Sequence, residues 1–160
     1  MLYLLQMQSL QTQRKEEAMS VIVRHLTAIS RCGSEYRKKY LEPVGIDARH
    51  ARFLFEICDK PGISQEGLAR RLLVDKSTVA RVCAVLEENG YILRQICAED
   101  RRITRVHPTE KTLAIFPQIQ EAWTTWEERI TQDLTPEEIE TLTTLLRKMK
   151  VSARAWIEEG

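Results

Sequence analysis

Residues 74–106 read VDKSTVARVCAVLEENGYILRQICAEDRRITRV, and this stretch decides the fold. Its first part, residues 76–89, has apolar residues at helical spacing. Asp75 stands just before it, where a carboxylate can accept a hydrogen bond from a backbone N–H of the first turn. Gly90 follows it, as is typical of a helix that ends in a left-handed residue. The pattern therefore predicts a well-delimited helix.

The second part of this stretch predicts a β-hairpin. Residues 91–97 and 102–107 alternate apolar and polar side chains and are rich in β-branched residues, which favours two strands. Residues 98–101 form their turn. Hairpin turns are usually built from Gly, Asn or Pro, whereas this turn is charged, with Arg101 at its end and Arg102 next to it. A charged hairpin tip needs an explanation.

Upstream, a short helix is predicted to begin after Ser64 and to cover residues 65–73, and another begins after Asp47. Two short helices joined by a tight turn form a helix-turn-helix pattern, and a hairpin directly after it makes the pattern that of a winged helix. The residues expected to face inward from the two short helices are Leu72, Val79, Val82, Val85 and Leu86.

Long helices flank this lobe on both sides. Residues 14–41 have apolar residues three and four apart, and another long helix is predicted to begin after Thr109. The last begins at Thr135, because Thr-Pro-Glu-Glu supplies a capping box with Pro in the first turn. Its apolar seam, spaced 3-4-3-4-3, consists of Ile139, Leu142, Leu146, Met149, Ala153 and Trp156.

The predicted fold class is mainly α (α+β): a winged helix-turn-helix with long N- and C-terminal helices. We expect a single domain over residues 1–160 with a winged lobe at 47–107. The flanking helices, within 1–41 and 109–160, are expected to mediate dimerisation.

Composition places the chain among cytoplasmic globular proteins. It is 43% hydrophobic and 29% charged, has no apolar run of the roughly 18 residues that span a bilayer, and lacks a basic segment of the signal-peptide type at its start. The four cysteines form no CxxC pair, so we expect free thiols. Net charge is +1, but residues 108–160 hold 6 Lys and Arg against 10 Asp and Glu, which leaves the basic excess to the front of the chain.

The helix over residues 76–89 has the chemistry of a DNA-recognition helix. Hydroxyl groups and backbone N–H groups at a helix N-terminus suit phosphate oxygens, and an arginine can reach a guanine edge. The candidate DNA-binding residues here are Lys76, Ser77, Thr78 and Arg81. Taken alone, the same residues would also fit a solvated surface helix.

In the hairpin tip, Arg101 and Arg102 are the candidate DNA-binding residues, with Arg101 suited to a narrow minor groove. The neighbouring Asp100 would repel phosphates unless it has a partner. We expect it to hold the wing by accepting hydrogen bonds from Arg81 or Arg102.

The stretch SQEGLARRLLVDKSTVARVCAVLEENGYILRQICAEDRRITRVHPTEK resembles the DNA-binding core of the MarR family of bacterial transcription regulators. The motifs that carry the resemblance are VDKSTV, LEENGYI, DRR and HPTEK. The chain departs from the family pattern at Gly67, where a better helix former is usual, and at Thr112, where Gly is frequent.

The resemblance implies a homodimer that binds a pseudo-palindromic operator in double-stranded DNA, often as a repressor released by a small aromatic ligand. It assigns major-groove or phosphate contacts to Ser77, Thr78 and Arg81, the wing tip to Arg101, and wing-holding roles to Asp100 and Arg102. Neither a cofactor nor a metal nor a membrane is implied.

Other candidates are weaker. Cys32 lies in the first long helix, where some regulators of this type sense oxidants, but burial as a small apolar residue is the favoured interpretation. Trp123 and Trp126 fit core positions better than a ligand pocket. The three histidines are too scattered for a zinc site, and no motif of an enzyme is present. Two alternatives to a ligand-released regulator stay open: a winged-helix protein-interaction module without its own operator, and a cysteine-based redox sensor.

Overall fold

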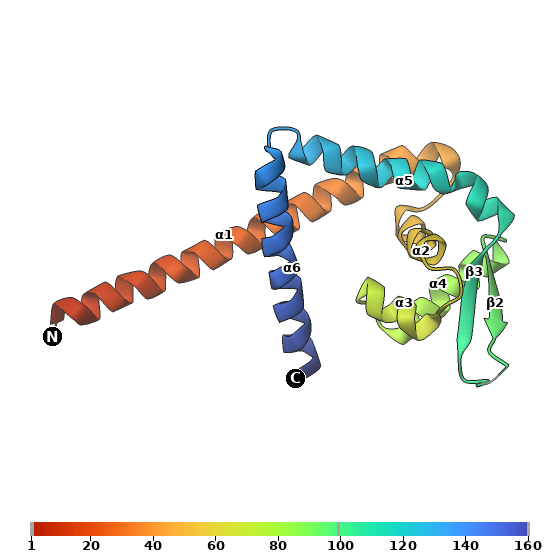
Figure 1. Ribbon diagram of the computed structural model, residues 1–160, viewed down its shortest axis with the longest axis horizontal. Helices are drawn as coiled ribbons and strands as arrows, with labels where there is room; N and C mark the ends of the chain where they lie inside the picture. The colour runs from red at the N-terminus through yellow and green to blue at the C-terminus, as the bar shows by residue number, and fades with distance from the viewer. Residues whose placement is uncertain (1, 99, 160) are drawn as a thin grey trace. The chain divides into compact units, whose positions relative to one another are not determined.

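The computed structural model describes residues 2–98 and 100–159, and side chains for residues 21–98 and 100–157. It is mainly α-helical with one small sheet, which confirms the predicted fold class. The elements, labelled in Figure 1, are α1 (Leu2–Leu41), η1 (Glu42–Val44), α2 (Ala48–Asp59), β1 (Ile63–Ser64), α3 (Gln65–Leu72), α4 (Lys76–Glu88), β2 (Ile92–Ile96), β3 (Thr104–Pro108), α5 (Glu110–Thr131) and α6 (Pro136–Glu159).

The chain forms two compact units, Met1–Trp123 and Thr124–Gly160. The first contains the helix-turn-helix, the hairpin and most of α5, and the second contains the end of α5 and α6. Within the described residues, no helix has the length and apolar character needed to cross a membrane.

Helix boundaries follow the predicted caps. The side chains of Asp47, Ser64 and Asp75 accept hydrogen bonds from backbone N–H groups at the starts of α2, α3 and α4. At α6, the Thr135 N–H donates to Glu138 Oε2 at 2.8 Å and the Glu138 N–H donates to Thr135 Oγ1 at 3.3 Å, which completes the capping box. These caps were predictable because each involves residues at most three apart.

The sheet has three antiparallel strands in the order β1-β3-β2, one more than predicted. Val106 of β3 pairs with Ile63 of β1 and with Arg94 of β2. The hairpin strands are also shorter than predicted, since 91–97 contracts to Ile92–Ile96 and 102–107 shifts to Thr104–Pro108. The connecting turn is correspondingly longer.

The core of the first unit lies where α2, α3 and α4 meet the hairpin, an arrangement visible in Figure 1. Leu41 from α1 and Ile119 from α5 complete it, and both are fully buried. One inward assignment was wrong: Val85 is exposed, and Cys83 is buried instead. A 3.6-residue period that brings Val79 and Leu86 inward also brings Cys83 inward and turns Val85 away.

Both long terminal helices expose apolar side chains. On α1 these are Val21, Ile22, Val23, Leu26 and Ile29, and on α6 they are Leu142, Leu145, Leu146, Met149, Val151, Trp156 and Ile157. These apolar side chains lie exposed on helices that also carry many charged residues.

Candidate nucleic-acid interface and adjoining pockets

The first two turns of α4 bring the predicted recognition residues together at one end of the helix. Lys76, Ser77 and Arg81 are exposed, and Thr78 is half-buried. Because they are exposed at a helix N-terminus, these side chains are accessible to a polyanion. The helix dipole favours negative charge at this end.

A hydrogen-bond network centred on Asp75 organises this helix end. Asp75 Oδ1 accepts from the Thr78 N–H at 2.7 Å and Oδ2 accepts from the Thr78 hydroxyl at 2.6 Å, while the Ser77 hydroxyl also donates to the carboxylate. Arg81 Nη2 in turn donates to Thr78 Oγ1 at 3.1 Å. The bonds from Ser77 and then Thr78 hold the pKa of Asp75 well below its usual range. The sequence predicted the cap but not this use of both hydroxyl groups.

Lys76 has a partner from the preceding helix that the sequence did not reveal. Its Nζ lies 2.9 Å from Glu66 Oε1, and Arg70 Nη1 lies 3.8 Å from the same oxygen. The pair lines a cleft of about 380 Å³ between the starts of α3 and α4 and the tip end of the wing, where β3 begins, and Arg102 lines the same cleft. The cleft is lined by Ser64, Gln65, Glu66, Arg70, Lys76, Arg102, Ile103 and Thr104.

At the wing tip, Asp100, Arg101 and Arg102 are all exposed. Asp100 Oδ1 accepts a hydrogen bond from the backbone N–H of Arg102 at 2.9 Å, and its carbonyl accepts from the Ile103 N–H at 2.9 Å. The expected pairing of Asp100 with a guanidinium is therefore replaced by a bond to the main chain, within the part of the tip that the structure describes. Asp100 therefore shapes the turn, and the side chains of Arg101 and Arg102 stay exposed.

Three arginine–carboxylate contacts outside the predicted site, made by two arginines, join elements of the lobe. Arg94 of β2 binds Glu87 of α4: its N–H donates to Oε1 at 3.1 Å and its Nε donates to Oε2 at 2.7 Å. Arg71 of α3 contacts Glu56 and Asp59 of α2, with Nη2 2.6 Å from Asp59 Oδ2. Because the partners lie 7 to 15 residues apart, no local motif signals them.

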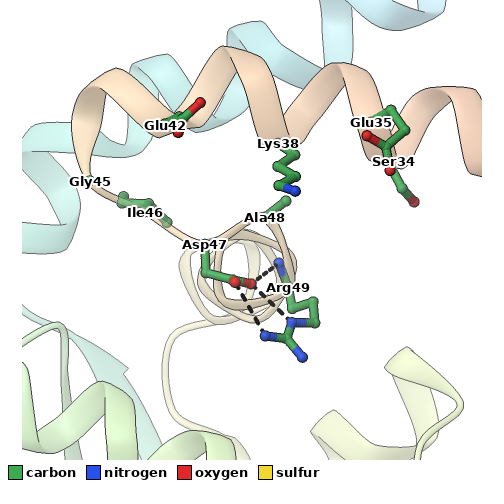
Figure 2. A pocket seen from close by; sticks show the side chains of 9 residues that line it. All are labelled: Ser34, Glu35, Lys38, Glu42, Gly45, Ile46, Asp47, Ala48 and Arg49. Carbon is green, nitrogen blue, oxygen red and sulfur yellow. Dashed lines mark hydrogen bonds and ion pairs between the residues drawn. The ribbon is translucent and has the colours of Figure 1, made fainter.

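On the other side of α2, a pocket of about 580 Å³ lies between α1 and the start of α2. Figure 2 shows its lining, with the Asp47 carboxylate facing the Arg49 guanidinium. Asp47 Oδ1 accepts from Arg49 Nε at 3.2 Å, and this contact lowers the pKa of Asp47.

A second pocket of about 350 Å³ shares Ser34, Ala48 and Arg49 with the first. Its other lining residues are Ser30, Arg37, Arg52 and Trp123. The Arg37 guanidinium lies 5.0 Å from the centre of the Trp123 ring, and desolvation followed by repulsion from Arg52 lowers the pKa of Arg37. Three arginines and an indole face make this pocket suited to an aromatic anion. Trp123, expected in the core, packs on it and lines the pocket as well.

The Arg52 side chain also connects this pocket to the helix-turn-helix. Its Nη2 donates to the carbonyl of Leu72 at 3.1 Å, at the end of α3. The following residue, Leu73, has φ of 54°, a left-handed conformation uncommon outside glycine. The pocket therefore contacts the turn that sets the position of α4.

The cysteines differ in burial. Burial raises the pKa of both Cys58 and Cys83 to about 11, which makes their thiols poor nucleophiles. Cys32 is exposed in this chain, so the expectation that it is buried was wrong. Among residues 31–35 of α1, only Gly33 is buried. Among the described residues, no cluster of three His, Cys, Asp or Glu side chains could hold a metal ion.

A helix-turn-helix with an exposed recognition helix, followed by a basic wing, defines the winged-helix class of nucleic-acid-binding proteins. The sequence model of the MarR family matches residues 44–103, which include α2, α3, α4 and the first strand of the wing, β2. The chain is 28% identical over 132 residues to an uncharacterized HTH-type transcriptional regulator, YybA of Bacillus subtilis, covering 82% of this chain and 88% of that protein.

Solved structures of transcriptional regulators match this chain over more than four fifths of its length. The transcriptional regulator SlyA is 30% identical, with a TM-score of 0.78 over 82% of this chain and 93% of that one. A MarR family regulator from Listeria monocytogenes, solved in complex with 26mer DNA, is 26% identical with a TM-score of 0.80, covering 84% and 91%. The chain belongs to the MarR family of transcription regulators. Members of this family are DNA-binding transcription factors and not enzymes.

Proposed function

We propose that the protein is a repressor that binds a pseudo-palindromic operator as a homodimer in the cytoplasm and leaves it when a small aromatic ligand binds. The observation that carries this proposal is the joint exposure of the α4 N-terminus and of Arg101 and Arg102 in one lobe, where Arg94 of β2 contacts Glu87 of α4. The solved DNA complex of the Listeria relative supports the same use of the fold.

In the proposed complex, the lobe of residues 47–107 places α4 in the major groove. Ser77 and Thr78 contact phosphates, and Arg81 reads a guanine edge, a contact that discriminates between bases by roughly 1–3 kcal/mol. Lys76 and Arg102 flank the cleft beside α4 and contact the backbone. Arg101 enters the minor groove.

The proposed dimer uses the terminal helices, within residues 1–41 and 109–160. The support is the apolar stripe on each of α1 and α6, which is exposed in a single chain. Leu142, Leu146 and Met149 are each 38–41% exposed and follow one face of α6. A second copy would cover such faces, and two-fold symmetry would match a palindromic site.

The ligand proposal rests on the arginine-lined pocket. A carboxylate there would bind Arg37 and Arg52, and an aromatic ring would find Trp123. A ligand that binds Arg52 competes with the Leu72 carbonyl for the guanidinium group. The turn before α4 would then lose its hydrogen bond from Arg52. The ligand can shift DNA binding only by its different affinity for the two arrangements.

The first test is an anisotropy titration with duplexes from upstream of the coding region, at two salt concentrations. We expect tight binding that falls steeply with salt, with a slope near −0.9 per phosphate neutralised. The wing variant Arg101→Ala with Arg102→Ala should bind more weakly and with a shallower slope. Equal binding by this variant would refute the DNA-binding role of the wing, and a shallow parent slope would favour the protein-interaction module.

The ligand proposal is tested with benzoate and its neutral analogue benzamide. Benzoate should release the parent from the operator and raise its melting temperature, and benzamide should do neither. In the Arg52→Gln variant, benzoate binding should weaken and release should be lost. Equal effects of the two compounds would refute an anion-binding pocket.

The redox alternative is supported only by the exposure of Cys32. Peroxide sensitivity of operator binding that disappears in Cys32→Ser would establish it.

A further inference from the structure

Glu66 is the only carboxylate that lines the cleft beside the α4 N-terminus, among the described lining residues, and three cations share that cleft with it. Lys76 Nζ lies 2.9 Å and Arg70 Nη1 lies 3.8 Å from Glu66 Oε1, and Arg102 lines the cleft from the wing. The Glu66 carboxylate therefore lies in a cleft that is lined by three positively charged side chains.

The location and charge of this cleft suit a DNA backbone phosphate. The cleft opens between the start of the recognition helix and the tip end of the wing, the two elements that would contact DNA in a winged-helix complex. A phosphate is an anion of similar oxygen geometry to a carboxylate, and Lys76 can donate to either. Gln65 also lines the cleft, and its Nε2 atom is buried without an acceptor among the described residues.

The Glu66 contact is not needed to begin α3. Ser64 already caps that helix, with its Oγ accepting from the Gly67 N–H at 3.0 Å. The hydrogen bond from Lys76 lowers the pKa of Glu66, so the carboxylate is charged at neutral pH. Both side chains are more than half exposed, and exposed ion pairs exchange partners at little cost.

We propose that Glu66 occupies the place of a backbone phosphate in the DNA-free protein and holds Lys76 until DNA displaces it. Glu66 thus weakens DNA binding because it competes with phosphate for Lys76. It weakens the binding of Lys76 to other polyanions in the same way. This inference rests on the proposed operator binding.

The test compares Glu66→Gln with the parent in operator titrations at low and moderate salt. Removing the competitor should tighten binding about two- to fivefold, the range that exposed ion pairs contribute. The gain should shrink as salt rises, because exposed charges are screened. The control is Glu88→Gln, which removes the same charge from the far end of α4 and should leave affinity unchanged.

A double-mutant cycle separates competition from direct repulsion between Glu66 and DNA. In the Lys76→Gln background, Glu66→Gln should give little further gain, because the contested cation is gone. An undiminished gain there overturns the proposal and shows direct repulsion. Unchanged affinity of Glu66→Gln, with operator binding by the parent intact, also overturns it. Absence of salt-sensitive operator binding by the parent would instead refute the proposed function, so the two failures are distinguishable.

Discussion

Asp75 combines two tasks at one residue: it caps α4 and it orients the hydroxyl groups of Ser77 and Thr78. Because hydrogen bonds to the charged carboxylate lower its pKa in the folded state, the residue adds stability above the pKa of the unfolded chain, near 3.9. That contribution is lost as pH falls below about 4 towards the folded-state pKa.

We therefore expect Asp75→Ala to be less stable than the parent at pH 7 and the difference to shrink progressively below pH 4. Urea denaturation at pH 7, 4 and 3 measures it. A stability difference that stays constant over this range would show that the carboxylate's charge contributes nothing. Operator binding should also weaken at neutral pH, since the cap and the orientation of both hydroxyl groups are lost together.

Thr112, at a position where Gly is frequent in the family, makes a buried hydrogen bond. It is fully buried, and its hydroxyl donates to the Tyr91 carbonyl, joining the start of α5 to the start of the hairpin. That carbonyl also accepts from the Thr109 N–H at 3.0 Å, so it keeps a partner if the hydroxyl is removed.

Thr112→Val should accordingly lower the free energy of unfolding by about 1 kcal/mol, the net value of one hydrogen bond. Chemical denaturation provides the measurement. Thr143→Val, at an exposed position of α6, is the matched control and should change stability by less than about 0.5 kcal/mol. Equal effects of the two substitutions would argue against the bond to Tyr91.

Among the elements, α4 and the hairpin must move as one body if the recognition helix and the wing are to engage DNA together. The Arg94–Glu87 contact joins them, with Nη2 2.5 Å from Oε2, and the contact raises the pKa of Arg94 and lowers that of Glu87. Neither residue is predicted to touch DNA, so their role is to position those that do.

Arg94→Gln and Glu87→Gln should each weaken operator binding about two- to fivefold, and the double variant should lose no more than either single one. Hydrogen exchange in β2 should become faster in all three. Additive losses in the double variant would indicate that the two residues act separately.

The elements that the sequence predicts are those set by contacts between close neighbours in the chain. Helix starts at Asp47, Ser64, Asp75 and Thr135 were predicted, because a cap is a contact between close neighbours in the chain. The strand β1 was not, because two residues carry no periodicity and pair with β3 more than forty positions away. The partners of Arg94 and Lys76 were not predicted either, because Glu87 and Glu66 lie on other elements and no local motif links them to these residues. The seam of α6 was predicted as apolar, and the structure adds that a single chain leaves it exposed.

At the scale of the whole molecule, operator binding by a dimer requires two recognition helices spaced to meet successive major grooves, roughly 34 Å apart. The terminal helices would set this spacing, and the arginine-lined pocket adjoins α1 and the turn before α4. A ligand could therefore act on the spacing and on the turn together. The effect on the spacing presupposes that the α6 seam joins two copies.

The seam is tested by Leu146→Glu, which places a charge in the middle of the apolar stripe. We expect sedimentation to show a species of 18.6 kDa for this variant and twice that mass for the parent. Burying an unpaired carboxylate between two helices is far costlier than leaving it in water, so the dimer should dissociate while far-UV circular dichroism still reports folded helices. Operator affinity should then fall by orders of magnitude, because one lobe alone contacts only a half-site.

Lys148→Glu, which also introduces a carboxylate but on the polar face of α6, is the control and should remain dimeric. If Leu146→Glu sediments as a dimer at micromolar concentration, the seam does not form the interface and the two copies must associate through another surface.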